Sequence, residues 1–341
     1  MPTNRTASFI LAVLVIGVGV TAGLLWRGDS PPLRSRSFEF QYITHVPALP
    51  AQAQKLRIWI PLPESNQQQE ISGLTLSSPV PYEIHREPEY GNPYAYIELA
   101  PAKAATPFEV KMSFQVKRAE HRVLAARSAS LAGRALAKPA DVTRFLQPDR
   151  LVPIDGIIAA LAEQEARGLS DPLEKARAIY NYVVKTMRYD KSGDGWGRGD
   201  AIYACNARRG NCTDFHALFI GMMRAAGIPA RFEIGFPLPR DRSEGEIPGY
   251  HCWAQFYLDG VGWIPVDASE AWQNASLRDY FFGAHDEHRV LFTRGRDIRF
   301  NPPQKGEPLN YFIYPYAELD DQPFPLVEAK FFFRDSAPAT R

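Results

Sequence analysis

Apolar and polar residues alternate along the chain from Phe38 onward. The period of two recurs at Leu56–Ile60, at Tyr94–Leu99 and most regularly at Phe108–Val116, and it is typical of strands with one buried face. Turn residues separate these runs at intervals found in β-sandwiches. We therefore predict an antiparallel β-sandwich domain over residues 37–118, with a structural or substrate-positioning role.

Helical periodicity replaces this alternation in the middle of the chain. Ile154–Arg167 and Pro172–Met187 both show apolar positions at spacings of three and four residues, which indicates amphipathic helices. We predict a helical connector over residues 119–170. A second domain, of the α+β class, is predicted over residues 171–334.

A third helical pattern begins at Cys212. Its apolar face repeats every three or four residues and ends at Gly227, followed by Pro229, which together form a helix stop signal. Free backbone N–H groups and the positive end of the helix dipole stabilise an anion at such an N-terminus. The pKa of the thiol therefore falls and the nucleophilic thiolate is populated. The alternative for a lone cysteine is a small buried core residue.

Two strands after this helix form a predicted hairpin around Asp259–Gly260. A two-residue loop would turn Asp267 away from the face that carries His251. A three-residue loop, with the glycine in the left-handed conformation, brings both side chains onto one face, and we predict this loop. A carboxylate beside a histidine fixes its tautomer, so that the other ring nitrogen can take the thiol proton of Cys212.

Four motifs along this region, RRGNCTD, RAAGIPAR, HCWAQFY and GWIPVDAS, together resemble those of bacterial transglutaminase-like domains. The resemblance covers roughly Asp171–Tyr316. It implies a papain-like transglutaminase core, in which a cysteine helix packs on an antiparallel sheet, and a catalytic triad of Cys212, His251 and Asp267. It also implies Asn206, six residues before the cysteine, as an oxyanion-hole candidate beside the backbone N–H of Cys212.

The resemblance implies acyl transfer on amide bonds of a protein or peptide substrate through a thioester. The superfamily includes transamidases, proteases and peptide deglycosylating enzymes, and we favour hydrolysis because no amine-acceptor site is specified. We predict no cofactor and no metal: His216 stands one helical turn after Cys212, but two ligands do not make a zinc site. The alternatives are a non-catalytic peptide- or envelope-binding module with the same fold, and a structural envelope protein.

The amino-terminal residues 7–26 form an apolar run. A run of about 20 residues is long enough to span a bilayer, and a cleaved signal peptide is the alternative. We predict residues 1–30 to be a membrane anchor or signal peptide, with the rest of the chain in the periplasm or outside the cell. The net charge of +1 gives no reason to expect nucleic acid as a partner.

The three cysteines are too few for a disulfide scaffold. If Cys212 is a free thiolate, the one disulfide compatible with activity joins Cys205 to Cys252, which alternation places on the core face of its strand. Two small buried thiols are the alternative, and the sequence does not decide between them.

Three further segments complete the predictions. The glycines of Lys191–Asp200 indicate a surface loop that is either a spacer or a wall of the active site. His285–His288 is predicted in a solvated loop, and Arg289 at the surface. The aromatic run Asn310–Tyr316 is predicted as a strand closing the sheet of the catalytic domain.

Overall fold

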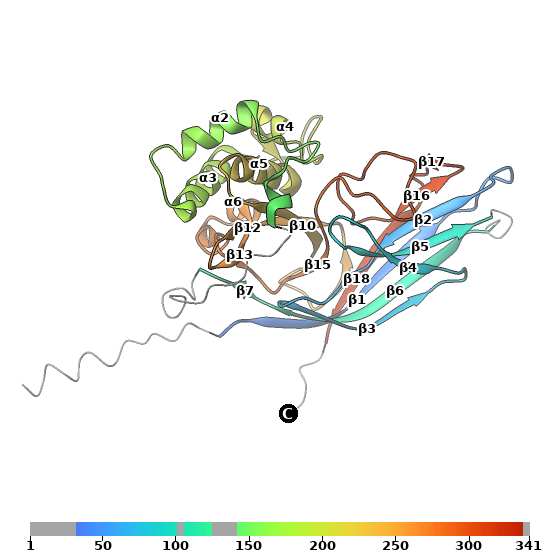
Figure 1. Ribbon diagram of the computed structural model, residues 1–341. Coiled ribbons are helices and arrows are strands. Elements are labelled where there is room, and N and C mark those ends of the chain that lie inside the picture. Colours follow the sequence, from blue (N-terminus) through green and yellow to red (C-terminus); the bar gives the residue numbers. More distant parts are fainter. Residues whose placement is uncertain (1–31, 101–105, 125–141, 337–341) are drawn as a thin grey trace, which may run out of the picture. The chain divides into compact units, whose positions relative to one another are not determined.

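The computed structural model describes residues 32–100, 106–124 and 142–336. It divides the chain into residues 1–32 and a compact unit of residues 33–341, to which every element below belongs (Figure 1). The predicted anchor or signal peptide lies outside the described residues, as does most of the segment between residues 120 and 141. Among the helices within these described ranges, none is long and apolar enough to cross a membrane.

Two five-stranded antiparallel sheets form a sandwich. The first has the order β11-β18-β1-β6-β3, with β1 (Ser35–Val46), β3 (Gln69–Ser77), β6 (Phe108–Ala119), β11 (Glu244–Ile247) and β18 (Glu328–Asp335). The second has the order β17-β16-β2-β5-β4, with β2 (Leu56–Pro61), β4 (Glu83–Arg86), β5 (Pro93–Leu99), β16 (Tyr316–Leu319) and β17 (Gln322–Pro323). Phe40 of β1 and Ile58 of β2 belong to one hydrophobic core, as the alternation predicts.

The sandwich also contains strands from the end of the chain. β18 pairs with β1, and β16 pairs with β2, so residues 316–335 differ from their predicted place in the catalytic domain. The predicted strand at Asn310–Tyr316 is wrong, because only Tyr316 lies in a strand. Phe312 of this run is nevertheless buried, and its ring packs on Phe300 with 4.8 Å between the ring centroids.

The helices surround α5 (Cys212–Ala225), in which all residues from Cys212 to Arg224 are buried. It packs on β10 and β12 of a four-stranded antiparallel sheet with the order β13-β12-β10-β15 (Figure 1). These strands are β10 (Ala230–Pro237), β12 (His251–Leu258), β13 (Gly262–Val266) and β15 (Arg289–Arg294). The protein is therefore a mixed α and β fold with antiparallel sheets, as predicted.

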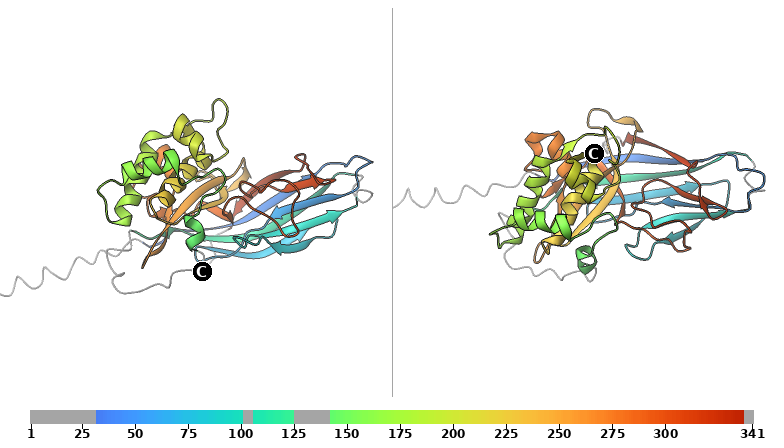
Figure 2. Two further views of the ribbon diagram at one scale, coloured as in Figure 1. Left: turned by 45° about the horizontal axis from the view of Figure 1, so that its top comes forward. Right: turned by 90° about the horizontal axis from the view of Figure 1, so that it is seen from above.

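The other helices are α2 (Gly156–Glu165), α3 (Pro172–Thr186), α4 (Ala201–Ala207) and α6 (Ala268–Gln273). Short elements include η2 (Val142–Leu146), η3 (Ala275–Leu277), the parallel pair β8 (Arg188–Tyr189) and β9 (Arg209–Gly210), and the antiparallel pair β7 (His121–Arg122) and β14 (Ala284–His285). α2 and α3 confirm the two helices predicted before the cysteine. In both views of Figure 2 the helices gather at one end of this unit, and the long strands β1 and β6 extend away from them.

Candidate active site

The first turn of α5 is held by a capping box. Asn211 is the N-cap residue, and its Oδ1 accepts a hydrogen bond from the Thr213 N–H at 2.9 Å. In return, Asp214 Oδ2 accepts from the Asn211 N–H at 2.9 Å. These bonds satisfy donors that a helix start leaves free. They place Cys212 as the first helical residue, as predicted.

The glycine-rich loop lies against this helix start. Asp214 also accepts hydrogen bonds from the backbone N–H groups of Gly197, at 2.7 Å, and Gly199, at 3.0 Å. Gly210 has a φ of 151°, and a Cβ atom there would overlap the Asp214 carboxylate, so glycine is required. Of the two predicted roles for Lys191–Asp200, a wall beside the N-terminus of α5 fits the structure.

The hairpin has the predicted loop. Leu258 pairs with Gly262 across the two strands, which leaves three residues in the turn, and Gly260 has a φ of 72°. The odd number of loop residues puts His251 and Asp267 on one face. His251 Nε2 donates a hydrogen bond to Asp267 Oδ2 at 2.8 Å, so the predicted contact is confirmed.

Charge couples the three predicted triad residues. Burial alone lowers the pKa of His251, but the charge and hydrogen bond of Asp267, with a hydrogen bond to Cys212, raise it well above its ordinary value. Burial raises the pKa of Asp267, whereas His251 and then Arg289 lower it well below its ordinary value. Asp267 is therefore ionised. Because Nε2 of His251 is bonded to Asp267, Nδ1 is the ring nitrogen left for the thiol.

Cys212 is 2% exposed. Burial raises the pKa of its thiol, but a hydrogen bond from the Cys252 thiol, then the hydrogen bond and charge of His251, bring the pKa well below its ordinary value. The positive end of the α5 dipole acts in the same direction. The arrangement can hold a thiolate–imidazolium pair.

A comparison with protein families finds a match for the part of the chain that contains the site. Residues 159–268 match the transglutaminase-like superfamily. This segment is similar to transglutaminase-like domains. It contains Cys212, His251 and Asp267, so the resemblance inferred from the four motifs is confirmed.

Relatives extend beyond the transglutaminase-like domain. An uncharacterized protein of Haemophilus influenzae is 29% identical over 322 residues, which span 82% of this chain and 84% of that protein. The solved structure of a proposed cysteine protease from Cytophaga hutchinsonii shares the fold, with a TM-score of 0.55 and 17% identity, over 88% of this chain and 98% of that one. The periplasmic domain of TgpA from Pseudomonas aeruginosa has a TM-score of 0.36 and 18% identity, over 72% and 93% of the two chains.

A buried charge network borders the domain, where a solvated loop was predicted. His285, Asp286 and Arg289 are at most 3% exposed, so the predictions of a solvated loop and a surface arginine are wrong. Arg289 donates to Asp267 Oδ2 at 3.0 Å and to Asp286 Oδ1 at 3.0 Å. Pairing of opposite charges permits the burial of this cluster. Charged residues are usually exposed to solvent. The neighbouring residues in the sequence do not reveal a charged partner that lies elsewhere in the chain.

His216 has a structural role in the α5 helix. Its Nδ1 lies 2.8 Å from the carbonyl oxygen of Cys212, and its Nε2 accepts from the Ala268 N–H at 3.2 Å. Burial lowers the pKa of His216, so the ring is neutral, with the proton on Nδ1. Both nitrogens already have backbone partners, which leaves neither free for a metal.

Asn206, the oxyanion candidate, lies on α4 and is exposed. Its side chain forms no hydrogen bond within the part of the chain that the structure describes, and its role stays a prediction. A different amide lies nearer the cysteine: Asn211 Nδ2 donates to the Tyr250 hydroxyl at 3.1 Å. Tyr250 directly precedes His251, and sequence reasoning missed it because an isolated tyrosine carries no catalytic signal.

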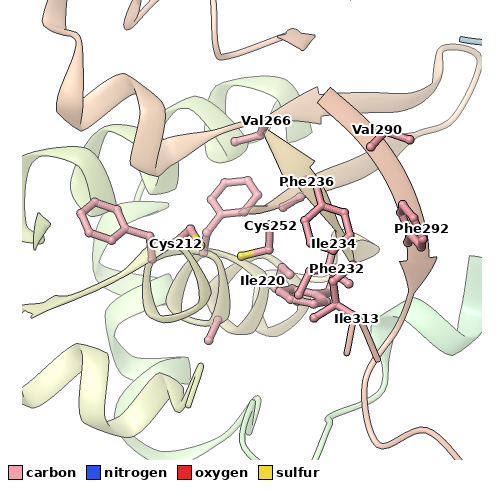
Figure 3. Close-up of a cluster of buried hydrophobic side chains, with 14 of the residues drawn as sticks. Cys212, Ile220, Phe232, Ile234, Phe236, Cys252, Val266, Val290, Phe292 and Ile313 are labelled. Carbon is pink, nitrogen blue, oxygen red and sulfur yellow. The ribbon is translucent and has the colours of Figure 1, made fainter. Parts of the chain in front are cut away.

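All three cysteines are free. The Cys252 sulfur points toward α5 (Figure 3) and lies 3.7 Å from His216 Nδ1. Cys252 is 0% exposed and belongs to the hydrophobic core, as predicted, and it also affects the pKa of the Cys212 thiol. The structure therefore has the alternative of buried thiols and not a bridge between Cys205 and Cys252.

A thiol assay on denatured, unreduced protein should count three free thiols, whereas one free thiol would indicate the bridge.

Selective alkylation should reveal the activated thiol. Because the pKa of Cys212 is lowered and those of Cys205 and Cys252 are raised, iodoacetamide should modify Cys212 first at pH 6, and its rate should fall only when the thiolate is protonated at lower pH. His251→Ala should slow this reaction, since the nearby imidazolium is lost. Mass spectrometry of peptides after timed labelling measures the three rates. Equal rates at all three cysteines would contradict the assignment.

Proposed function

We propose that this protein is a cysteine enzyme that cleaves amide bonds in a protein or peptide by acyl transfer through a thioester. The observation that carries the proposal is the His251 ring, which donates a hydrogen bond to Asp267 at 2.8 Å and whose charge lowers the pKa of the Cys212 thiol. A nucleophile, a base and a group that orients the base are the minimum parts of such a site.

The mechanism follows from the positions of these groups. The Cys212 thiolate attacks the carbonyl carbon of the substrate, and the negative charge moves to the carbonyl oxygen. The backbone N–H of Cys212, at the start of α5, is the proposed donor to this oxyanion. The His251 imidazolium then gives its proton to the leaving amine, and a thioester on Cys212 remains.

Water resolves the thioester in the proposed reaction. Neutral His251 removes a proton from the attacking water, and the thiolate leaves with the acid product released. We propose hydrolysis over transfer to an amine because the sequence specifies no amine-acceptor site. Two other parts of the proposal come from the sequence. The apolar run at residues 7–26 supports association with a membrane, and it also supports a site of action outside the cytoplasm.

One observation favours a non-catalytic binding module as the second candidate. Cys212 is 2% exposed and His251 is 6% exposed, so a substrate must displace neighbouring groups to reach the sulfur. A thiol-directed activity probe separates the two candidates, since only an accessible, activated thiolate reacts with it.

Peptide profiling tests the proposed activity directly. Envelope proteins from the native host are incubated with the purified protein or with Cys212→Ala, and new peptide ends are identified by mass spectrometry. A labelled primary amine in a parallel sample reports transfer. Ends that appear only with the wild-type protein support hydrolysis, and amine incorporation would replace hydrolysis by transamidation. Identical profiles with both proteins, together with no probe labelling, would refute the enzyme and leave the binding module.

A further inference from the structure

We propose that Arg289 is a positioning residue that sets the acidity of His251 by sharing the Asp267 carboxylate with it. The inference rests on the proposed function, in which the His251 imidazolium must give up its proton to a leaving amine. Nothing in the sequence around Arg289 suggests this role, because Asp267 lies 22 residues away from it along the chain.

The two cations meet on one oxygen atom. Asp267 Oδ2 accepts from His251 Nε2 at 2.8 Å and from Arg289 Nη1 at 3.0 Å. The other oxygen, Oδ1, accepts from neutral donors, which are the Ser269 hydroxyl at 3.1 Å and the Glu270 N–H at 3.0 Å. Arg289 therefore competes directly with His251 for the negative charge of Asp267.

Arg289 is fixed on its remaining sides. Its Nε donates to Asp286 Oδ1 at 3.0 Å, and its guanidinium carbon lies 4.8 Å from the centre of the Trp253 ring. Trp253 is in turn held by Glu233, which accepts from its indole N–H at 2.8 Å. With Arg289 itself 2% exposed, the guanidinium has one position, and water does not screen its charge.

The physical consequence concerns proton transfer. Asp267 raises the pKa of His251, and an unshared buried carboxylate would raise it further, because the interaction of unlike charges grows as the local dielectric falls. A more stable imidazolium is a weaker acid toward the leaving amine. By offsetting part of the charge on Asp267, Arg289 keeps His251 ionised yet able to donate its proton.

Other groups near the pair do not replace Arg289. His216 and His285 are neutral, since burial lowers both pKa values, and Glu270 Oε1 lies 4.0 Å from His251 Nε2. The titratable and charged groups that face His251 and Asp267 are Cys212 and His216 of α5, Cys252 of β12, Glu270 of α6, Tyr180 of α3, Tyr189 of β8, His285 of β14, Asp286 between β14 and β15, and Arg289 of β15. Of these, Arg289 is the arginine in contact with Asp267.

The test measures the pKa of His251 in the full chain by NMR of ¹³C-labelled histidine, with the signal assigned by its loss in His251→Ala. Removing one charge that contacts the carboxylate should shift this pKa by about one unit or more. Arg289→Met should therefore raise the pKa of His251, and Arg289→Lys, which keeps the charge, should leave it close to the wild-type value.

Arg224→Met is the matched control. Arg224 is also buried and pairs with Asp149 at 2.7 Å, but it does not contact the triad. Its loss should lower stability without moving the pKa of His251. If Arg289→Met lowers stability in the same way and leaves this pKa unchanged, Arg289 is merely structural and the proposal is overturned.

Two further variants test the proposal if Arg289→Met does not fold. Arg289→Gln keeps an N–H donor and removes the charge, and it should also raise the pKa of His251. Asp286→Asn keeps Arg289 and frees its charge for Asp267, so it should lower that pKa, and an unchanged or raised value would overturn the proposal. These titrations need no substrate. A wild-type protein without amide cleavage would therefore refute the proposed function and leave the charge effect separately measurable.

Discussion

Replacing Cys212 with serine is expected to lower turnover of an amide substrate by roughly 10⁶-fold, the scale on which enzymes with a nucleophile–histidine–acid triad lose rate when the nucleophile is removed. The serine hydroxyl has nearly the size of the thiol, so the first turn of α5 should keep its capping box. Its pKa is far too high for the His251 pairing to ionise it, and the thiolate that begins the reaction is lost.

Cys205→Ser is the matched control for this substitution. Cys205 is a buried cysteine of α4 with no contact to the triad, so the same chemical change there should leave turnover unchanged. Initial rates on a peptide found by profiling, with the folded fraction checked by circular dichroism, measure both variants. A Cys212→Ser protein that retains turnover within tenfold of wild type would show that another group is the nucleophile.

Replacing Gly235 with alanine is expected to destabilise the protein by about 3 kcal/mol or more, since overpacking against backbone exceeds the usual cost of an added methyl group. A Cβ atom at Gly235 would overlap the carbonyl oxygen of Val290 on the neighbouring strand β15. Gly235 pairs with His251 on one side and Leu291 on the other, beside a β-bulge. The added methyl group would therefore separate the strand of His251 from the strand of Arg289.

Gly249→Ala is the control for this effect. The nearest atom to a Cβ there is the Tyr314 hydroxyl at 3.6 Å, an ordinary contact, and its cost should stay below about 1 kcal/mol. Urea unfolding followed by tryptophan fluorescence compares the two variants with wild type. Equal midpoints for Gly235→Ala and wild type would mean that β15 can move away from β10 without loss, against the packing described above.

Local periodicity in the sequence predicts many of the helices and strands of the fold. The helix that starts at Cys212 follows from apolar spacings and from the Gly227 stop, because both act within a few residues. The shared face of His251 and Asp267 follows from the strand period of two together with a loop of three residues. Each of these features depends on backbone geometry alone, so a single sequence determines it without knowledge of distant contacts.

Which distant segments meet depends on long-range packing. The return of β16 and β18 to the sandwich, the approach of the Cys252 sulfur to Cys212, and the burial of Arg289 on Asp267 all join residues whose local patterns are ordinary. The physical reason is that strand pairing and charge pairing act through space, and a period of two marks a buried face without naming what covers it. Local pattern is therefore enough to predict the members of the candidate triad, whereas long-range packing sets the charges that surround them.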